Sequence, residues 1–261
     1  MPFREFTETI AGCDTHFMRG GSGEPLLFLH GANGVPAWLP FMEALSERFD
    51  VIVPEHPGYG ASGMPEWLDN IGDLAFFYLD VIDHFGLKNV NLVGQSIGGW
   101  VALELAVRND TSLASLIVNA PPGIRIPGLR KADIFLWSPE ETVRNLFHDQ
   151  SFAEKALAMA PTTDEQQMVQ LKNRLTTAKL AWEPRFYNPD LEKWLHRIST
   201  PTLVLWGDQD KLIPPPYGPD LARRIPGAIS ETFTDCGHLP YVEKADEFVA
   251  RVTRFIEEAA R

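Results

Sequence analysis

Short apolar runs alternate with segments of helical spacing along most of the chain, and this alternation limits the fold more than any other sequence feature. The runs have the length of strands and are rich in Val, Leu and Ile; they lie at 26–29, 51–53, 90–93, 116–118 and 203–206. Between them, helical segments lie at 37–48, 71–85 and 97–108. Such alternation builds right-handed βαβ units and a mostly parallel sheet with helices on both faces. We therefore predict an α/β fold with an antiparallel start at 3–10 and 15–19.

The alternation stops in the middle of the chain. A Pro- and Gly-rich stretch at 121–128 leads into helix-forming segments at 139–147 and 164–181, and the strand pattern resumes at Pro201. A chain of 261 residues can form one large domain that carries an insertion. We predict a core in two parts and a helical cap between them, at 1–122, 198–261 and 123–197 respectively.

A serine lies where a predicted strand meets a predicted helix. Residues 94–98 read GQSIG and match the pattern G-x-S-x-G, which requires a strand before it and a helix after it. The turn is so tight that the backbone of Ser96 is strained, and side chains two positions to either side would collide with the neighbouring strand and helix. Glycine at Gly94 and Gly98 avoids these collisions. The motif predicts a nucleophilic Ser96 above the carboxyl edge of the sheet.

A serine hydroxyl is a poor nucleophile until a base takes its proton, and the base needs an orienting carboxylate. Two acids, Asp208 and Asp210, follow the strand at 203–206, and His238 comes later in the chain. We predict that His238 is the base for Ser96 and that one of the two aspartates orients it.

Attack on a carbonyl creates an oxyanion, which needs N–H donors. The backbone N–H of Ile97, at the start of the predicted helix, is one candidate. We place the second in the loop at 30–34, which reads HGANG, where glycines such as Gly31 let backbone amides turn inward. Ala32 is our choice for this donor, and Asn33 is the alternative.

The remaining histidines are given structural roles. His30 is expected to brace the oxyanion loop rather than to react, because His238 already fills the role of base. Metal-ligand spacings such as H-E-x-x-H and clusters of Cys are missing from the sequence, so we predict neither a metal nor a cofactor. The histidines expected to pack or to face solvent are His56, His84, His148 and His196.

Together these motifs resemble the α/β-hydrolase superfamily with an inserted lid. The resemblance covers nearly the whole chain, through HGANG at 30–34, EHPGYGAS at 55–62, GQSIGG at 94–99, WGDQDKLIP at 206–214 and CGH at 236–238. It implies the α/β-hydrolase fold and the chain order serine, acid, histidine. In similar proteins the acid is usually the third residue after the glycine that ends the strand, which favours Asp210 over Asp208. Glu55 stands where the family usually has Asp.

The predicted activity is that of a cofactor-independent serine hydrolase, most simply one that cleaves carboxylic esters through an acyl-enzyme on Ser96. Serine at this turn argues against similar epoxide hydrolases and haloalkane dehalogenases, which employ Asp there. A carbon–carbon bond hydrolase of aromatic ring-cleavage products is the closest alternative, although that family usually has Trp where Leu239 stands and a different oxyanion loop. A non-catalytic sensor of a small ligand and a cofactor-free perhydrolase are further alternatives.

The cap is rich in aromatic and basic side chains. A pocket roofed by several aromatic residues favours an apolar or aromatic acyl or alcohol group, although most of these residues are expected to pack as core. The basic residues are expected to face solvent, and Arg125 and Arg185 are the candidates if a carboxylate partner faces the pocket. The bases in question are Arg125, Arg130, Lys131, Arg174, Lys179 and Arg185.

Composition limits the partners and the location. The net charge of −12 disfavours nucleic acid and anionic membranes, so we expect a small-molecule substrate and leave a homo-oligomer open. We predict that Cys13 and Cys236 are free thiols in a reducing compartment. The sequence shows neither a signal-like start nor a run of about 18 apolar residues, which predicts a cytoplasmic protein.

Overall fold

The computed structural model describes residues 3–260. Within this range the strands form one eight-stranded sheet in the order β1-β2-β4-β3-β5-β6-β7-β8. β2 runs antiparallel to β1 and β4, and all the other pairs are parallel, so the predicted α/β class and its antiparallel start are confirmed. The strands are β1 (Arg4–Ile10), β2 (Cys13–Gly21), β3 (Pro25–Leu29), β4 (Asp50–Pro54), β5 (Val90–Gln95), β6 (Leu113–Asn119), β7 (Thr202–Gly207) and β8 (Ile229–Phe233).

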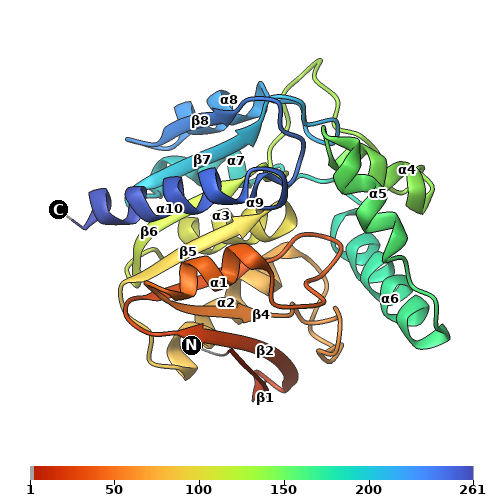
Figure 1. Ribbon diagram of the computed structural model, residues 1–261. Helices are drawn as coiled ribbons and strands as arrows, with labels where there is room; N and C mark the ends of the chain where they lie inside the picture. Colours follow the sequence, from red (N-terminus) through yellow and green to blue (C-terminus); the bar gives the residue numbers. More distant parts are fainter. Residues whose placement is uncertain (1–2, 261) are drawn as a thin grey trace.

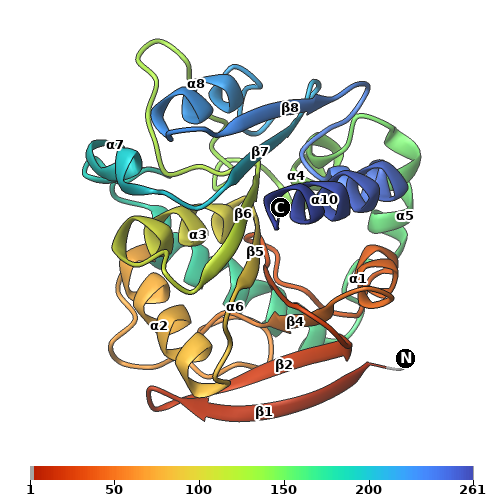
Figure 2. The ribbon, with the colours of Figure 1, turned by 90° about the vertical axis from the view of Figure 1, so that its left-hand side faces the viewer.

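Helices cover both faces of the sheet (Figure 2). Alternate residues of β3 supply the two hydrophobic clusters: Leu27 and Leu29 point to one face, Leu26 and Phe28 to the other. The first cluster includes residues of α2 (Ile71–His84), α3 (Ile97–Arg108) and α8 (Tyr217–Arg224), and the second includes residues of α1 (Pro40–Ser46) and α10 (Ala245–Ala259).

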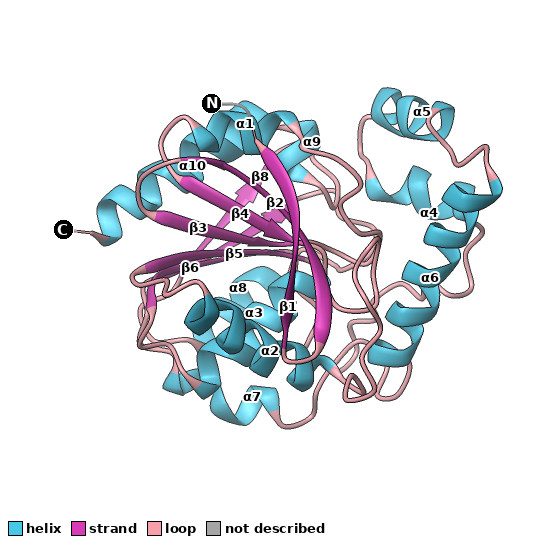
Figure 3. Cartoon of the chain, turned by 90° about the horizontal axis from the view of Figure 1, so that it is seen from below, coloured by secondary structure: helices cyan, strands magenta, loops and turns pink. Residues whose placement is uncertain are grey.

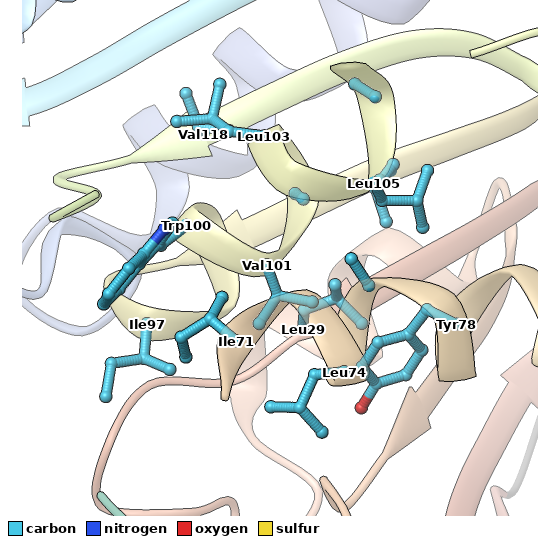
Figure 4. Packing of buried hydrophobic residues seen from close by; sticks show 14 of the residues in the cluster. Leu29, Ile71, Leu74, Tyr78, Ile97, Trp100, Val101, Leu103, Leu105 and Val118 are labelled. Carbon is cyan, nitrogen blue, oxygen red and sulfur yellow. The ribbon is translucent and has the colours of Figure 1, made fainter. Parts of the chain in front are cut away.

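Figure 4 shows the first cluster, in which Val101 of α3 and Leu74 of α2 pack near Leu29 of β3. Trp100, at the start of α3, is buried here as expected, and its indole Nε1–H donates to Glu104 Oε1 at 3.1 Å. Because α3 is apolar on most sides and almost completely buried, it is held rigidly between the sheet and α2. The serine at its first turn therefore rests on a fixed support.

Strand register brings the predicted site residues together. Leu29 of β3 pairs with Gly94 of β5, and Gln95 pairs with Asn119 of β6, which in turn pairs with Leu205 of β7. The loops after these parallel strands therefore leave the sheet side by side. In open α/β sheets this carboxyl edge is where ligands bind.

The segment between β6 and β7 contains the helices α4 (Pro139–Leu146), α5 (Gln150–Ala158) and α6 (Asp164–Ala181), which stand to one side of the sheet (Figures 1 and 3). Local capping explains two of the starts: Ser138 accepts from Glu141 N–H before α4, and Thr163 accepts from Gln166 N–H before α6. The helix predicted at 164–181 has the observed bounds, whereas α5 was not predicted.

The last part of the predicted cap lies elsewhere. α7 (Leu191–Trp194) and the 3-10 helix Leu195–Arg197 pack against α3 of the core. The division at 123–197 stays a prediction, and the outer ends of the predicted core, residues 1, 2 and 261, lie outside the described residues.

The last two helices of the described chain are α9 (Pro240–Glu243) and α10. None of the helices in residues 3–260 is both long and apolar enough to cross a bilayer.

Candidate active site

Ser96 occupies the turn between β5 and α3. Its backbone has φ 50° and ψ −118°, a conformation that residues with a Cβ atom adopt rarely and at a cost of about 1–3 kcal/mol. Two hydrogen bonds hold it there: Ser96 N–H donates to Asn119 O at 2.8 Å, and Ser96 O accepts from Trp100 N–H at 3.0 Å. The strain that the sequence motif implies is therefore present at the predicted nucleophile.

The two glycines of the motif lie against backbone. A Cβ atom on Gly98 would be 2.1 Å from Leu29 O and 2.5 Å from His30 O, and one on Gly94 would be 2.5 Å from Gly98 O. These obstacles are main-chain atoms of the central strand and of the turn itself, so they cannot move aside as a side chain would. The close approach of α3 to the end of β3 depends on the absence of a side chain at Gly98, and its close approach to β5 depends on the absence of one at Gly94.

Gly98→Ala is expected to destabilise the protein by about 3 kcal/mol, because the added methyl group would push α3 away from the end of β3. Chemical denaturation followed by tryptophan fluorescence measures this loss. Gly63→Ala is the matched control, since a Cβ atom there would meet its nearest neighbour, Asp14 O, at an ordinary 3.5 Å. The two variants should differ clearly; equal stability would show that the turn adjusts easily.

His238 and Asp210 form a buried pair. Imidazole Nδ1 lies 2.7 Å from Asp210 Oδ2, and both side chains are almost inaccessible to solvent. The other carboxylate oxygen, Oδ1, accepts the backbone N–H groups of Leu212 at 2.8 Å and Ile213 at 3.0 Å. Because the ionised carboxylate can only accept, Nδ1 carries the proton and Nε2 carries the lone pair.

The lone pair of His238 is free. Nε2 is buried and has no hydrogen-bond partner among residues 3–260. Ser96 and His238 line the same cavity, so the structure brings these two predicted residues to one place, with Asp210 behind the imidazole. A buried nitrogen left without a partner is uncommon and fits a group that exchanges protons with a bound molecule.

Asp208 has a different environment from Asp210. Its Oδ1 accepts the backbone N–H of Cys236 at 3.2 Å, and its own N–H donates to Phe233 O at 3.0 Å. Asp208 thus joins the loop after β7 to the loop that carries His238. The neighbouring acid, Asp210, is the one that contacts the imidazole.

The loop at 30–34 lies directly beside the nucleophile. A Cβ atom on Gly31 would be 3.4 Å from Ser96 Cβ, and Ala32, Asn33 and Ile97 all line the cavity. The N–H groups in the first turn of α3 lack partners within the helix, so that of Ile97 is available to a ligand. Both predicted oxyanion donors therefore border the same space as Ser96.

His30 and a second histidine, His56, brace this loop. His30 Nε2 accepts His56 N–H at 2.9 Å, which leaves the proton on Nδ1; that group donates to Gly31 O at 2.7 Å. The Ala32 N–H belongs to the same planar peptide as Gly31 O, so fixing the carbonyl also fixes the predicted donor. Burial lowers the pKa of His30 to about 4, so the ring is neutral.

His56 is fully buried and also neutral. Its Nε2–H donates to His30 O at 2.8 Å, and its Nδ1 accepts from the hydroxyl of Tyr78. Burial, followed by the neighbouring His30, lowers the pKa of His56 well below its usual value. The sequence placed His56 among the packing or surface histidines without revealing its contact with the oxyanion loop.

The turn that carries His56 contains Glu55, the residue at which the chain departs from the family pattern. Glu55 Oε2 accepts Ala61 N–H at 2.7 Å and lies 3.3 Å from His16 Nδ1. Burial raises the pKa of this carboxyl. A Cβ atom on Gly60, whose φ is +49°, would be only 1.9 Å from Glu55 Oε1, so the longer acid fills the space beneath the turn.

Helix α6 is hydrogen-bonded both to the turn that contains Gly60 and to the loop at 30–34. Asn173 Oδ1 accepts Gly60 N–H at 2.9 Å, and its Nδ2 donates to Asn33 O at 3.0 Å. Thr177 Oγ1 donates to Ala32 O at 3.3 Å. Sequence reasoning missed these contacts, because polar residues on a predicted surface helix do not disclose which loop they meet.

The cavity above Ser96 has a volume of ≈ 330 Å³, within the range of small-molecule sites. Its lining is largely apolar, and it contains Lys131, which the sequence placed among the solvent-facing bases. The two bases proposed as carboxylate partners are engaged elsewhere: Arg185 pairs with Asp133, and Arg125 lies over the ring of Tyr187. The apolar residues contributed by the segment between β6 and β7 include Ile134, Val143, Leu146, Phe147, Ala156 and Phe186.

The arrangement of potential metal ligands and the state of the two cysteines can be read from the described residues. No group of three His, Cys, Asp or Glu side chains within residues 3–260 is arranged to hold a metal ion. Cys13 and Cys236 are free, as predicted, and both are buried. Burial raises the pKa of Cys236 above the usual range, so this thiol beside His238 stays protonated.

Known proteins that are similar to this chain include several hydrolases. The chain is 27% identical to 2-hydroxy-6-oxo-6-phenylhexa-2,4-dienoate hydrolase of Comamonas testosteroni, over 93% of this chain and 91% of that protein. It is 28% identical to 2-hydroxymuconate semialdehyde hydrolase of Pseudomonas sp. (strain CF600), over 95% and 92%. The meta-cleavage product hydrolase of Pseudomonas fluorescens IP01 has the same fold, with a TM-score of 0.80 at 21% identity over 97% of this chain and 98% of its own.

The family model described as "Alpha/beta hydrolase family" matches residues 26–251. This range runs from β3 to α10 and includes every predicted site residue. The chain belongs to the alpha/beta hydrolase family, and its activity is that of a hydrolase.

Proposed function

We propose that the protein is a serine hydrolase that cleaves carboxylic esters of small apolar or aromatic substrates through an acyl-enzyme on Ser96. One observation carries the proposal: the buried His238 donates through Nδ1 to Asp210, leaves Nε2 without a partner, and shares an apolar cavity with Ser96. Such an imidazole is prepared to take a proton from a hydroxyl group beside it.

In the proposed first half-reaction, Ser96 Oγ attacks the ester carbonyl while His238 Nε2 takes its proton. The negative charge that develops on the carbonyl oxygen is stabilised by the N–H groups of Ile97 and Ala32, with Asn33 as the alternative to Ala32. His238, now an imidazolium beside the Asp210 carboxylate, gives its proton to the departing alcohol. The product of this step is an ester of the acid on Ser96.

In the second half-reaction, water takes the place of the alcohol. His238 Nε2 removes a proton from the water molecule, which attacks the acyl-enzyme at the same carbonyl carbon. The same donors hold the second oxyanion, and return of the proton to Ser96 Oγ releases the acid. The apolar lining favours an acyl or alcohol group that loses little hydration on entry.

A carbon–carbon bond hydrolase is the second candidate, because the two relatives named above are hydrolases of a dienoate and of a semialdehyde and match this chain over nearly its full length. Leu239, which follows His238, lines the cavity at the position where carbon–carbon bond hydrolases of ring-cleavage products usually have Trp. The cavity therefore lacks an indole at this point.

Substrate panels separate the two candidates. Wild-type protein given phenyl butanoate, phenyl benzoate and the ring-cleavage product 2-hydroxy-6-oxo-6-phenylhexa-2,4-dienoate should hydrolyse the esters, with a burst of phenol when deacylation is slower than acylation. Turnover of the dienoate with inert esters would favour the carbon–carbon bond hydrolase. Inertness toward all three, together with no labelling of Ser96 by a fluorophosphonate, would refute a serine hydrolase of either kind.

A further inference from the structure

The cavity contains a lysine whose positive charge is not used by the proposed ester chemistry. Lys131 lines the cavity with Ser96 and His238. Its Nζ donates to Ile124 O at 2.6 Å and to Phe186 O at 2.8 Å. An ammonium group has three N–H donors, so one is left after these two bonds.

Two carbonyl oxygens orient the ammonium group without neutralising it. Among the described residues, no carboxylate lies within ion-pair distance of Lys131. The charged side chain that affects its pKa is Arg125, which is also positively charged. Burial, with a smaller effect of Arg125, lowers the pKa of Lys131 to about 7. The Tyr217 ring, 5.1 Å from Nζ, offers only a weak attraction.

An unpaired cation beside an apolar cavity is costly unless something compensates its charge. The fold holds this ammonium in place on both sides: Ala132 N–H donates to Leu212 O at 2.8 Å, and the accepting carbonyls belong to Ile124 and Phe186. The amino group of Lys131 is thus held in one position, unlike that of a flexible surface lysine, and a bound anion would favour its charged form. A bound anion would supply both the missing acceptor and the missing charge.

We propose that Lys131 binds a carboxylate of the substrate and so makes the protein prefer esters that carry a second, ionised carboxyl group. This inference rests on the proposed ester hydrolysis. The acceptor of the third N–H is one carboxylate oxygen, and the aliphatic part of the substrate lies along the apolar lining between Lys131 and Ser96. Lys131 contacts neither Ser96 nor His238 by a hydrogen bond, so it determines specificity and does not move protons.

Matched pairs of esters test the preference. Monomethyl adipate is compared with methyl hexanoate, which places the carboxylate on the acyl side, and 4-(butanoyloxy)butanoate with butyl butanoate, which places it on the alcohol side. Wild-type protein should show a higher kcat/KM for the anion in one of the pairs. In Lys131→Met this preference should fall by about 10- to 100-fold, the contribution of one hydrogen bond between charged groups, while the neutral ester is retained.

Two further variants separate the contact from the general charge of the site. Lys131→Arg keeps a cation and should retain part of the preference. Arg125→Met removes a nearby cation that lies over Tyr187, outside the cavity lining, and that disfavours the charge of Lys131, so this variant should not lower the preference. Equal loss in Arg125→Met and Lys131→Met would show a diffuse field and contradict a binding contact.

The outcomes for the activity and for the contact are distinct. Turnover of both neutral esters without preference for either anion would overturn the role of Lys131 and leave ester hydrolysis standing. If none of the four esters reacts, calorimetric binding of adipate and hexanoate still decides the role of Lys131. Wild-type protein should bind adipate about tenfold more tightly than the Lys131→Met variant does, whereas the two proteins should bind hexanoate equally well. Equal binding of adipate by the two proteins would overturn the inference.

Discussion

Ser96→Ala should lower kcat for ester hydrolysis by about 10⁴- to 10⁶-fold, because the oxygen that forms the acyl-enzyme is removed. The residual rate would come from binding and from the oxyanion donors, which the substitution leaves in place. Alanine at this position tolerates φ 50° no worse than serine does, so the fold should persist. Steady-state kinetics with phenyl butanoate, alongside a thermal unfolding curve, measures both effects.

The initial burst of phenol is a second measurement of the effect of Ser96→Ala. Wild-type protein should release phenol in an initial burst when deacylation is slow, and Ser96→Ala should show none and should not be labelled by a fluorophosphonate. Ser151→Ala, on the exposed side of α5, is the control and should behave as wild type. If Ser96→Ala kept its activity within tenfold of wild type, the nucleophile would have to be sought elsewhere.

The positions of the central strands along the chain and their mostly parallel arrangement were predictable from the sequence, because parallel strands buried on both faces are continuous apolar runs. β8 was missed for the opposite reason. It is an edge strand with sequence ISETF, partly exposed along its length, with Ile229 44% exposed. Its pairing with β7 depends on the sheet already present, so the segment itself carries no strong strand signal.

Two differences between the predicted and observed helices have local causes. The helix expected at 37–48 begins only at Pro40, because a residue before proline is driven out of the helical region; Leu39 has φ −94° and ψ 157°. α5 has nine residues and a cap at Asp149, whose side chain accepts Ser151 N–H. Its short length leaves too little periodicity for a prediction from sequence.

The site shows the same division between local and long-range information. Ser96 and His238 were identified because each is carried by a short motif, and the turn at Ser96 requires its neighbouring glycines. His56, Asn173 and Lys131 were not assigned to the site, since each one reaches it through contacts with segments far away in the sequence. No pattern in the sequence around these three residues records those contacts.

The two aspartates after β7 give the sharpest test of the proposed triad. In Asp210→Asn the amide oxygen is forced toward the N–H groups of Leu212 and Ile213, because those donors need an acceptor. The amide NH₂ then faces His238 Nδ1, which must become the acceptor. The proton moves to Nε2, where it blocks the uptake of the serine proton.

We therefore expect Asp210→Asn to lower kcat by about 10⁴-fold with an intact fold, as the loss of the correct tautomer does in serine proteases. Asp208→Asn is a matched control of the same chemistry: its amide oxygen can still accept Cys236 N–H, so kcat should stay within about threefold of wild type. Steady-state kinetics of both variants decides the assignment. A large loss in Asp208→Asn with little loss in Asp210→Asn would mean that the imidazole is oriented by the other acid during turnover, which would require the loop after β7 to rearrange when substrate binds.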